Sequence, residues 1–137
     1  MEPSAELQGV IRSWFESVAK GDASWLDTHL SSDKRLRIIG TDPQEWLQGQ
    51  QAADLLKADL AVMGGKVTIQ VKEVEAFSEG SVGWGVALPE ITLVDGKKVA
   101  PRWSAVFRRE NGDWKAVQVH ASVGVTNEQL FGVEFPQ

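Results

Sequence analysis

The stretch Arg102–Ser122, RWSAVFRRENGDWKAVQVHAS, has the pattern of two strands that flank a tight turn. Apolar residues alternate with polar ones from Trp103 onward, which is the period of a half-buried strand. Asn111-Gly112 supplies two residues that tolerate positive φ, and this pair is the strongest hairpin signal in the chain. The stretch therefore predicts two long antiparallel strands, the second spanning about residues 114–125.

The same alternation fills the chain between Lys66 and this hairpin. The turn signals Glu79-Gly80 and Asp95-Gly96 divide that region into two further strands. Long strands joined in sequence by tight turns predict one antiparallel sheet in the C-terminal half of the chain.

The N-terminal half has the spacing of amphipathic helices. Apolar residues recur at helical spacing over Ser4–Lys20, and Gly21 follows as a helix end. Asp22 can cap a second, short helix, a short strand covers residues 35–39, and a third apolar stripe ends at Gly64-Gly65. Helices that precede strands indicate an α+β fold. Three N-terminal helices on one face of a curved sheet would leave a pocket between the layers.

Composition restricts the partners. The chain has 137 residues, without repeats or linkers, and we interpret residues 1–137 as one domain. Its net charge of -5 argues against nucleic acid and against an anionic membrane surface as partners. The N-terminal residues lack a signal-peptide pattern, and no apolar stretch approaches the ~18 residues of a membrane-spanning helix. We therefore expect a cytoplasmic protein.

The sequence also lacks the signature of a metal or cofactor site. It contains no cysteine, which excludes disulfides, thiolate metal ligands and a cysteine nucleophile. HxH and HExxH spacings, a glycine-rich phosphate loop and a nucleotide-binding fingerprint are absent as well. We therefore expect neither a metal nor a cofactor.

Short motifs in a fixed order resemble the SnoaL-like branch of the nuclear transport factor 2-like superfamily, which includes ketosteroid isomerase. The motifs are Trp14-Phe15, Ile39–Trp46 with Gly49, Gly83-Trp84, Gly112–Lys115 and Val119–Ser122. The resemblance implies a cone-shaped α+β fold in which three helices pack on a curved antiparallel sheet. It implies no single reaction, since such proteins include isomerases, cyclases, hydrolases, dehydratases and non-catalytic binding domains.

His120 is the main candidate for a catalytic residue. Simple alternation places it between Gln118 and Ser122 on one face of the last strand, together with Trp114 and Ala116. If that face lines the cone, the imidazole can act as an acid or base near neutral pH. The alternative is a buried histidine whose nitrogens are satisfied by the backbone or by Ser122.

The six tryptophans suggest aromatic walls for an apolar ligand. At least half of them are expected to fill the core instead. Trp46, in a loop at the predicted cavity mouth, is the one most expected to contact ligand. The predicted lining consists of Trp14, Trp46, Trp84, Trp103, Phe107 and Ser122, together with His120.

Other polar residues have both a functional and a structural interpretation. Asp42 and Glu45 flank a proline turn and are either a catalytic base or ordinary turn residues. His29 is interpreted as a half-buried helix residue, and Arg102 either binds an anionic ligand group or lies on a solvated or dimeric sheet face. Tyrosine is absent, so the chain lacks the tyrosine donor that steroid isomerisation of the ketosteroid type requires.

Three hypotheses about function follow. The first is a binding protein for a small hydrophobic molecule, with a mainly apolar, tryptophan-lined cavity. The second is an enzyme that performs acid–base chemistry on a hydrophobic carbonyl or polyketide-like substrate, with His120 as acid or base. The third is a dimerisation domain without a ligand.

We also expect a homodimer that pairs through the outer sheet face, because a continuous apolar strand face would otherwise be exposed. That face is assigned to Val117, Val119, Ala121 and Val123. If the two faces are reversed, these residues are core and the polar face meets the partner. Sheet-to-sheet pairing is also what the resemblance implies.

Overall fold

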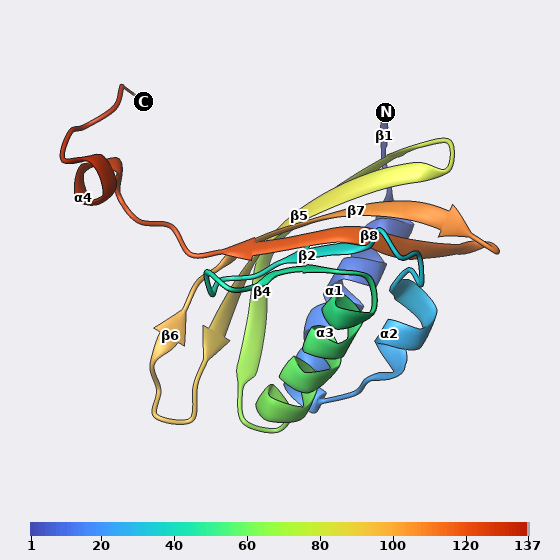
Figure 1. Ribbon diagram of the computed structural model, residues 1–137, viewed down its shortest axis with the longest axis horizontal. Helices are drawn as coiled ribbons and strands as arrows, with labels where there is room; N and C mark the ends of the chain where they lie inside the picture. Colours follow the sequence, from blue (N-terminus) through green and yellow to red (C-terminus); the bar gives the residue numbers. More distant parts are fainter. Residues whose placement is uncertain (137) are drawn as a thin grey trace.

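The computed structural model describes residues 1–136 and confirms the predicted α+β class (Figure 1). Helices α1, α2 and α3 lie together on one side of a curved sheet, and the small helix α4 lies apart near the C-terminus. The helices are α1 (Ala5–Lys20), α2 (Ser24–His29), α3 (Gly49–Met63) and α4 (Asn127–Phe131). The strands are β1 (Glu2–Pro3), β2 (Arg37–Ile39), β3 (Trp46–Gln48), β4 (Thr68–Glu79), β5 (Val82–Thr92), β6 (Lys98–Val99), β7 (Arg102–Glu110) and β8 (Asp113–Ser122).

The strands of residues 1–136 form one sheet in the order β1-β4-β5-β7-β8-β2-β3, with β6 paired to β5. Neighbouring strands are antiparallel except for β2 and β8, which run parallel. The prediction of a wholly antiparallel sheet is therefore wrong at this pair. After α2 the chain runs along the edge of β8, where the Ser31 amide donates to the Ala116 carbonyl at 3.0 Å, and it enters β2 in the same direction.

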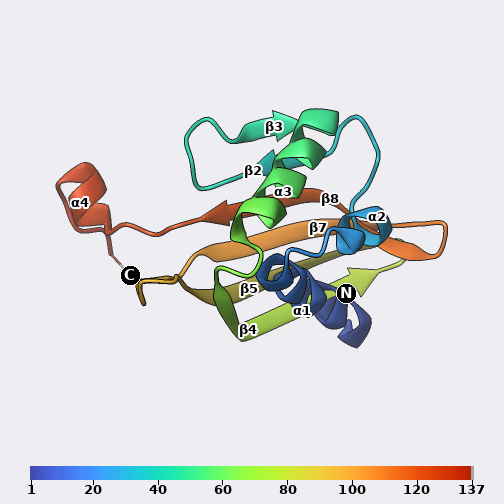
Figure 2. The same cartoon turned by 90° about the horizontal axis from the view of Figure 1, so that it is seen from below.

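Helix α1 forms because its sequence buries one stripe and closes both ends. The Ser4 side chain accepts a hydrogen bond from the Leu7 amide, and Gly21 ends the helix with a φ of 73°. The stripe packs on β4 and β5, and Figure 2 shows α1 lying across these strands. Gly83 and Gly85 face it, and a Cβ at either position would collide with Leu7 or Ile11. The buried stripe is Leu7, Val10, Ile11, Trp14, Phe15 and Val18.

Two β-bulges bend the long strands around the helices. The register between β4 and β5 shifts at Lys72, and the register between β7 and β8 shifts at Val117. A bulge adds one unpaired residue, which bends the strand and increases its twist. The sheet consequently curves toward α1 and α3.

The bulge at Val117 also changes which side chains share a face of β8. Trp114 and Ala116 are buried on the helix side together with Val119, whereas His120 is exposed on the opposite side. The expectation that Trp114 and His120 share one face is therefore wrong. The extra residue reverses the alternation halfway along the strand, which periodicity alone does not reveal.

The predicted element bounds differ from the structure mainly at their ends. The Asp22 carboxylate accepts from the Ser24 amide at 2.9 Å, but α2 begins without a side-chain cap. The expected loop at Trp46 is strand β3, and the last strand ends at Ser122. The short elements β1, β6 and α4 were not expected.

No helix within residues 1–136 has the length and apolar character needed to cross a membrane.

Candidate functional site

A cavity of about 280 Å³ lies between the helices and the concave face of the sheet. Helix α1 contributes Trp14 and Phe15 to its wall, and α3 contributes Leu56. The sheet side includes Trp103 from β7 and Val119 from β8. The remaining lining residues are Val18, Ile38, Ile39, Gly40, Thr41, Glu45, Leu55, Asp59, Met63, Ile69, Pro89, Ile91, Pro101 and Ala121.

The aromatic part of the wall is held by packing against the core. The Phe15 and Trp103 rings meet edge to face with centroids 5.5 Å apart. The Trp14 and Trp25 rings pack together with centroids 4.8 Å apart. The Trp25 indole nitrogen donates to the Val10 carbonyl at 3.0 Å. These contacts fix the rings before any ligand arrives.

Two carboxylates interrupt this apolar lining. Asp59 lies on the inner stripe of α3, four residues after Leu55 and four residues before Met63, and its side chain is half-buried. Glu45 comes from the turn before β3, where one of its carboxylate oxygens accepts from the Asp42 amide at 2.8 Å. The turn thus anchors Glu45 on the side of the cavity formed by residues 40–45.

The environment of Asp59 disfavours its charged form. Burial raises its pKa to about 6, and the negative charge of Glu45 acts in the same direction. Among the described residues that line the cavity, no lysine, arginine or histidine offsets these two charges. Asp59 can therefore gain or lose a proton near neutral pH.

Asparagine at position 59 is expected to stabilise the protein at pH 7.5 by about 1 kcal/mol relative to wild type. The aspartate binds its proton more tightly in the folded state than at its ordinary pKa of 3.8. Its contribution is therefore most favourable below pH 4 and is lost as pH rises through 6, whereas asparagine does not titrate. Chemical denaturation at pH 4.0 and pH 7.5 measures the difference. An advantage of Asp59→Asn that is as large at pH 4.0 as at pH 7.5 would contradict this account.

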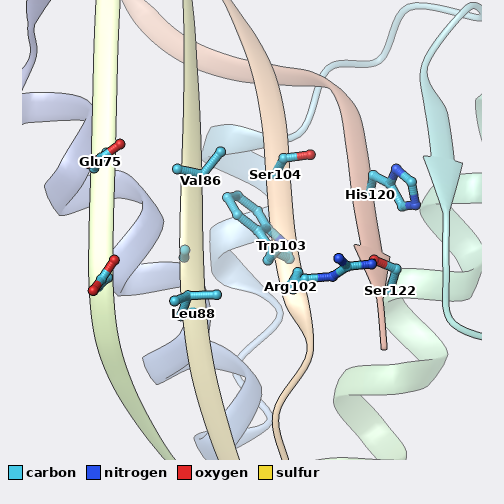
Figure 3. Close-up of a pocket in the computed structure, with 10 residues that line it drawn as sticks. Glu75, Val86, Leu88, Arg102, Trp103, Ser104, His120 and Ser122 are labelled. Carbon is cyan, nitrogen blue, oxygen red and sulfur yellow. The ribbon is translucent and has the colours of Figure 1, made fainter. Parts of the chain in front are cut away.

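A second hollow, of about 450 Å³, lies on the outer face of the sheet (Figure 3). His120 and Ser122 of β8 border it together with Arg102 and Ser104 of β7. An Arg102 guanidinium nitrogen donates to the Ser122 hydroxyl at 3.3 Å. The other lining residues are Glu73, Glu75, Val86, Ala87, Leu88 and Trp103. His120 and the neighbouring Ala121 thus border different hollows on opposite sides of β8.

The structure does not bring the predicted lining residues to one place. Trp14 and Trp103 line the inner cavity, while Phe107 is completely buried in the core and does not border it. His120 and Ser122 border the outer hollow.

Two of the predicted tryptophans lie away from the inner cavity. Trp84 is on the outer sheet face, where the centroids of its ring and the Phe77 ring are 5.0 Å apart. Trp46 is 65% exposed, and the Arg37 guanidinium lies 5.1 Å from the centre of its ring. Neither residue contributes to the cavity lining.

Sequence reasoning missed Asp59. A signal was present, since this aspartate interrupts the apolar stripe of α3 at helical spacing from Leu55 and Met63.

The structural interpretation of His29 agrees with the geometry, because its half-buried ring donates from Nδ1 to the Trp114 carbonyl at 2.9 Å.

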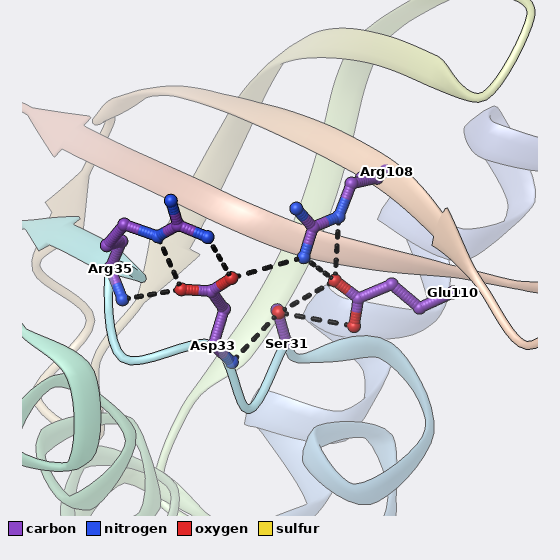
Figure 4. Close-up of polar contacts among 5 residues, drawn as sticks. All are labelled: Ser31, Asp33, Arg35, Arg108 and Glu110. Atoms are coloured by element: carbon purple, nitrogen blue, oxygen red, sulfur yellow. Dashed lines mark hydrogen bonds and ion pairs between the residues drawn. The ribbon is translucent and has the colours of Figure 1, made fainter.

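A separate polar cluster connects the α2–β2 segment to the end of β7 (Figure 4). Arg35 holds Asp33 with two side-chain hydrogen bonds of 3.0 and 2.9 Å, which keeps the pKa of that carboxyl well below its usual range. A guanidinium nitrogen of Arg108 donates to the Asp33 carboxylate at 3.4 Å and also to the Glu110 carboxylate. The Glu110 carboxylate accepts a further hydrogen bond from the Ser31 hydroxyl at 3.0 Å. Both arginines are engaged by carboxylates in this cluster, which links the α2–β2 segment to β7.

Comparison with known proteins supports the fold and identifies the domain type. A model of the SnoaL-like domain matches residues 7–126. No curated protein matches the chain. An NTF2-like protein of unknown function from Pseudomonas putida KT2440 superimposes with a TM-score of 0.78 at 14% identity, covering 97% of this chain and 94% of the other.

Two further solved structures illustrate how broadly this fold is used. A candidate ketosteroid isomerase from Shewanella frigidimarina has a TM-score of 0.68 at 17% identity, covering 83% of this chain and 92% of the other. The association domain of C. elegans CaMKII also has a TM-score of 0.68, at 12% identity, covering 86% of this chain and 93% of the other. At these identities the likeness demonstrates a common fold and leaves the activity open.

Proposed function

Because the chain belongs to the SnoaL-like domain family, we propose that it binds a small, mainly apolar molecule in the cavity between its helices and the sheet. The observation that carries this proposal is the cavity itself, whose lining is apolar apart from a few polar groups. Binding pockets usually combine such a lining with a small number of polar groups that orient the ligand. A volume of about 280 Å³ lies at the lower end of the sizes of small-molecule pockets and therefore favours a compact ligand.

The aromatic wall supports this function more than a purely structural role. Trp14 and Phe15 come from α1, and Trp103 comes from β7, so that rings from both layers border one space. A domain whose only role is dimerisation gains nothing from unfilled space between its layers, since packing that space would increase its stability.

Ligand binding is expected to be weakened by filling the cavity and unaffected by changing the outer hollow. Ala121 and His120 are adjacent in β8 but border different hollows, so they offer a matched pair of sites. Isothermal titration calorimetry with 4-phenylbutan-1-ol, a neutral probe, is expected to show about tenfold weaker binding for Ala121→Leu. His120→Ala should bind as wild type does.

The opposite pattern of binding affinities in these two variants would assign the ligand site to the outer face of the sheet. If His120→Ala loses binding while Ala121→Leu keeps it, the ligand occupies the outer hollow and the sequence-based assignment of His120 is correct. If wild type binds no apolar probe, the third hypothesis of a ligand-free dimerisation domain is favoured. Thermal unfolding of both variants checks that each remains folded.

Acid–base catalysis in the same cavity is the second candidate function. One observation favours it, namely that Asp59 has a pKa raised to about 6 and faces the apolar lining. A carboxyl group of that pKa can donate a proton below pH 6 and accept one above it. His120 lies on the other face of the sheet, so Asp59 takes the role that the sequence assigned to that histidine.

We further propose that two copies of the chain pair through the outer sheet face. Strand β5 presents a row of exposed apolar side chains there, of which Trp84 lies opposite Phe77 of β4. Exposed apolar surface of this extent on a sheet marks an interaction site. The exposed fractions are 50% for Val82, 37% for Trp84, 36% for Val86 and 44% for Leu88. This row is centred on β5, whereas the sequence assigned the apolar outer face to the last strand.

A further inference from the structure

The charged side chains that line the inner cavity are all acidic in the described part of the chain. Asp59 projects from α3 and Glu45 from the turn before β3, and the repulsion between them is part of what raises the pKa of Asp59. Helix α1 and strands β4, β5, β7 and β8 contribute no charged side chain to the lining. The electrostatic potential in the cavity is therefore negative. The apolar walls exclude water that would otherwise screen the two carboxylate charges.

Both carboxylates have free capacity to accept hydrogen bonds. Glu45 receives the Asp42 amide on one oxygen, and its second oxygen has no hydrogen bond from residues 1–136. No side chain or amide in the same residues donates to the Asp59 carboxylate, although it is half-buried. A bound group that donates hydrogen bonds and carries positive charge would satisfy both.

We propose that the cavity selects hydrophobic amines, binding the apolar body against Trp14 and Trp103 and the ammonium group at Asp59 and Glu45. This inference rests on the proposed function and adds the class of ligand. An ammonium group has three donors and no acceptor, which matches two carboxylates in need of donors. A ligand carboxylate would add a third negative charge to the same space and is rejected.

A series with one apolar body and three head groups tests this selectivity. Calorimetric titrations at pH 7.5 use 4-phenylbutylamine, 4-phenylbutan-1-ol and 4-phenylbutyrate. The amine is expected to bind at least tenfold tighter than the alcohol, and the carboxylate at least tenfold weaker than the alcohol. The amine's advantage should shrink at pH 5.0, where Asp59 becomes protonated.

Asp59→Asn keeps the shape of the side chain and removes its charge. In this variant the advantage of the amine over the alcohol is expected to fall to about threefold or less. Glu73→Gln is the matched control, because Glu73 borders the outer hollow and its substitution removes an equal charge from the protein without touching the cavity. The control should keep the full preference for the amine.

The outcomes separate this inference from the proposed function. If alcohol and amine bind equally, or if the carboxylate binds as tightly as the amine, the cavity binds apolar molecules without selecting amines and the inference is wrong. It is equally wrong if the preference survives in both Asp59→Asn and Glu45→Gln. If none of the three compounds binds, the proposed function fails, and the amine inference fails with it.

Discussion

Replacing Phe107 by alanine is expected to lower the free energy of unfolding by about 3–5 kcal/mol. The ring is completely buried on the helix side of β7, where it belongs to the same core as Leu7 and Ile11. Its removal loses the transfer free energy of a phenyl ring and leaves space that a close-packed core refills only in part. Denaturant titration followed by tryptophan fluorescence measures the loss.

Val106→Ala is the matched control for this substitution. Val106 precedes Phe107 in β7 but lies half-buried on the outer face, so its truncation should cost about 1 kcal/mol or less. The sequence placed Phe107 among the ligand-binding residues, whereas the cavity lining does not include it. Binding of 4-phenylbutan-1-ol by folded Phe107→Ala should therefore match wild type. A stable variant that has lost binding would return Phe107 to the site.

Leu88→Glu is expected to convert a dimer into a monomer, with a rise of at least 100-fold in the dimer dissociation constant. Leu88 lies in the exposed apolar row of β5, and 44% of its surface is accessible. In a paired sheet face the new carboxylate would be buried without a partner, which is costly. Glu73 lies directly opposite Leu88 in β4, so the substitution also places two like charges side by side. Sedimentation velocity across micromolar concentrations reports the equilibrium.

Val62→Glu introduces a carboxylate on α3, on the helix side of the sheet. Val62 is 65% exposed, and its substitution should leave the dimer intact. Because Leu88 is already exposed in the single chain, the Leu88→Glu monomer should stay folded and keep its cavity. A wild-type protein that sediments as a monomer at micromolar concentration, or a dimer that tolerates Leu88→Glu, would contradict pairing through β5.

Side-chain periodicity anticipated the helices well. Helix α1 was expected over Ser4–Lys20 and runs over Ala5–Lys20, because a strong apolar stripe and a glycine cap are local signals. The tight turn at Asn111-Gly112 was anticipated for the same reason, and Asn111 has a φ of 54°. Such features depend on residues within one or two turns of chain, so the sequence alone contains them.

The positions of the candidate site residues were anticipated only in part. Trp14 and Trp103 were expected in the cavity and line it, whereas His120 and Ser122 border the outer hollow. The difference arises at one residue, because the bulge at Val117 reverses the alternation of β8 before His120 is reached. Whether a strand carries a bulge is decided by its partner's register, which local alternation does not encode.

The sequence by itself determined the order of the helices and strands, the positions of the tight turns and the apolar stripes that form the core. Only the tertiary structure decided which face of β8 meets the helices and which carboxylates share the cavity. Asp59 and Glu45 belong to different elements, and they act on each other only after α3 has packed over the sheet beside the turn of residues 40–45. Burial and a neighbouring charge then raise the pKa of Asp59, and both causes are products of packing.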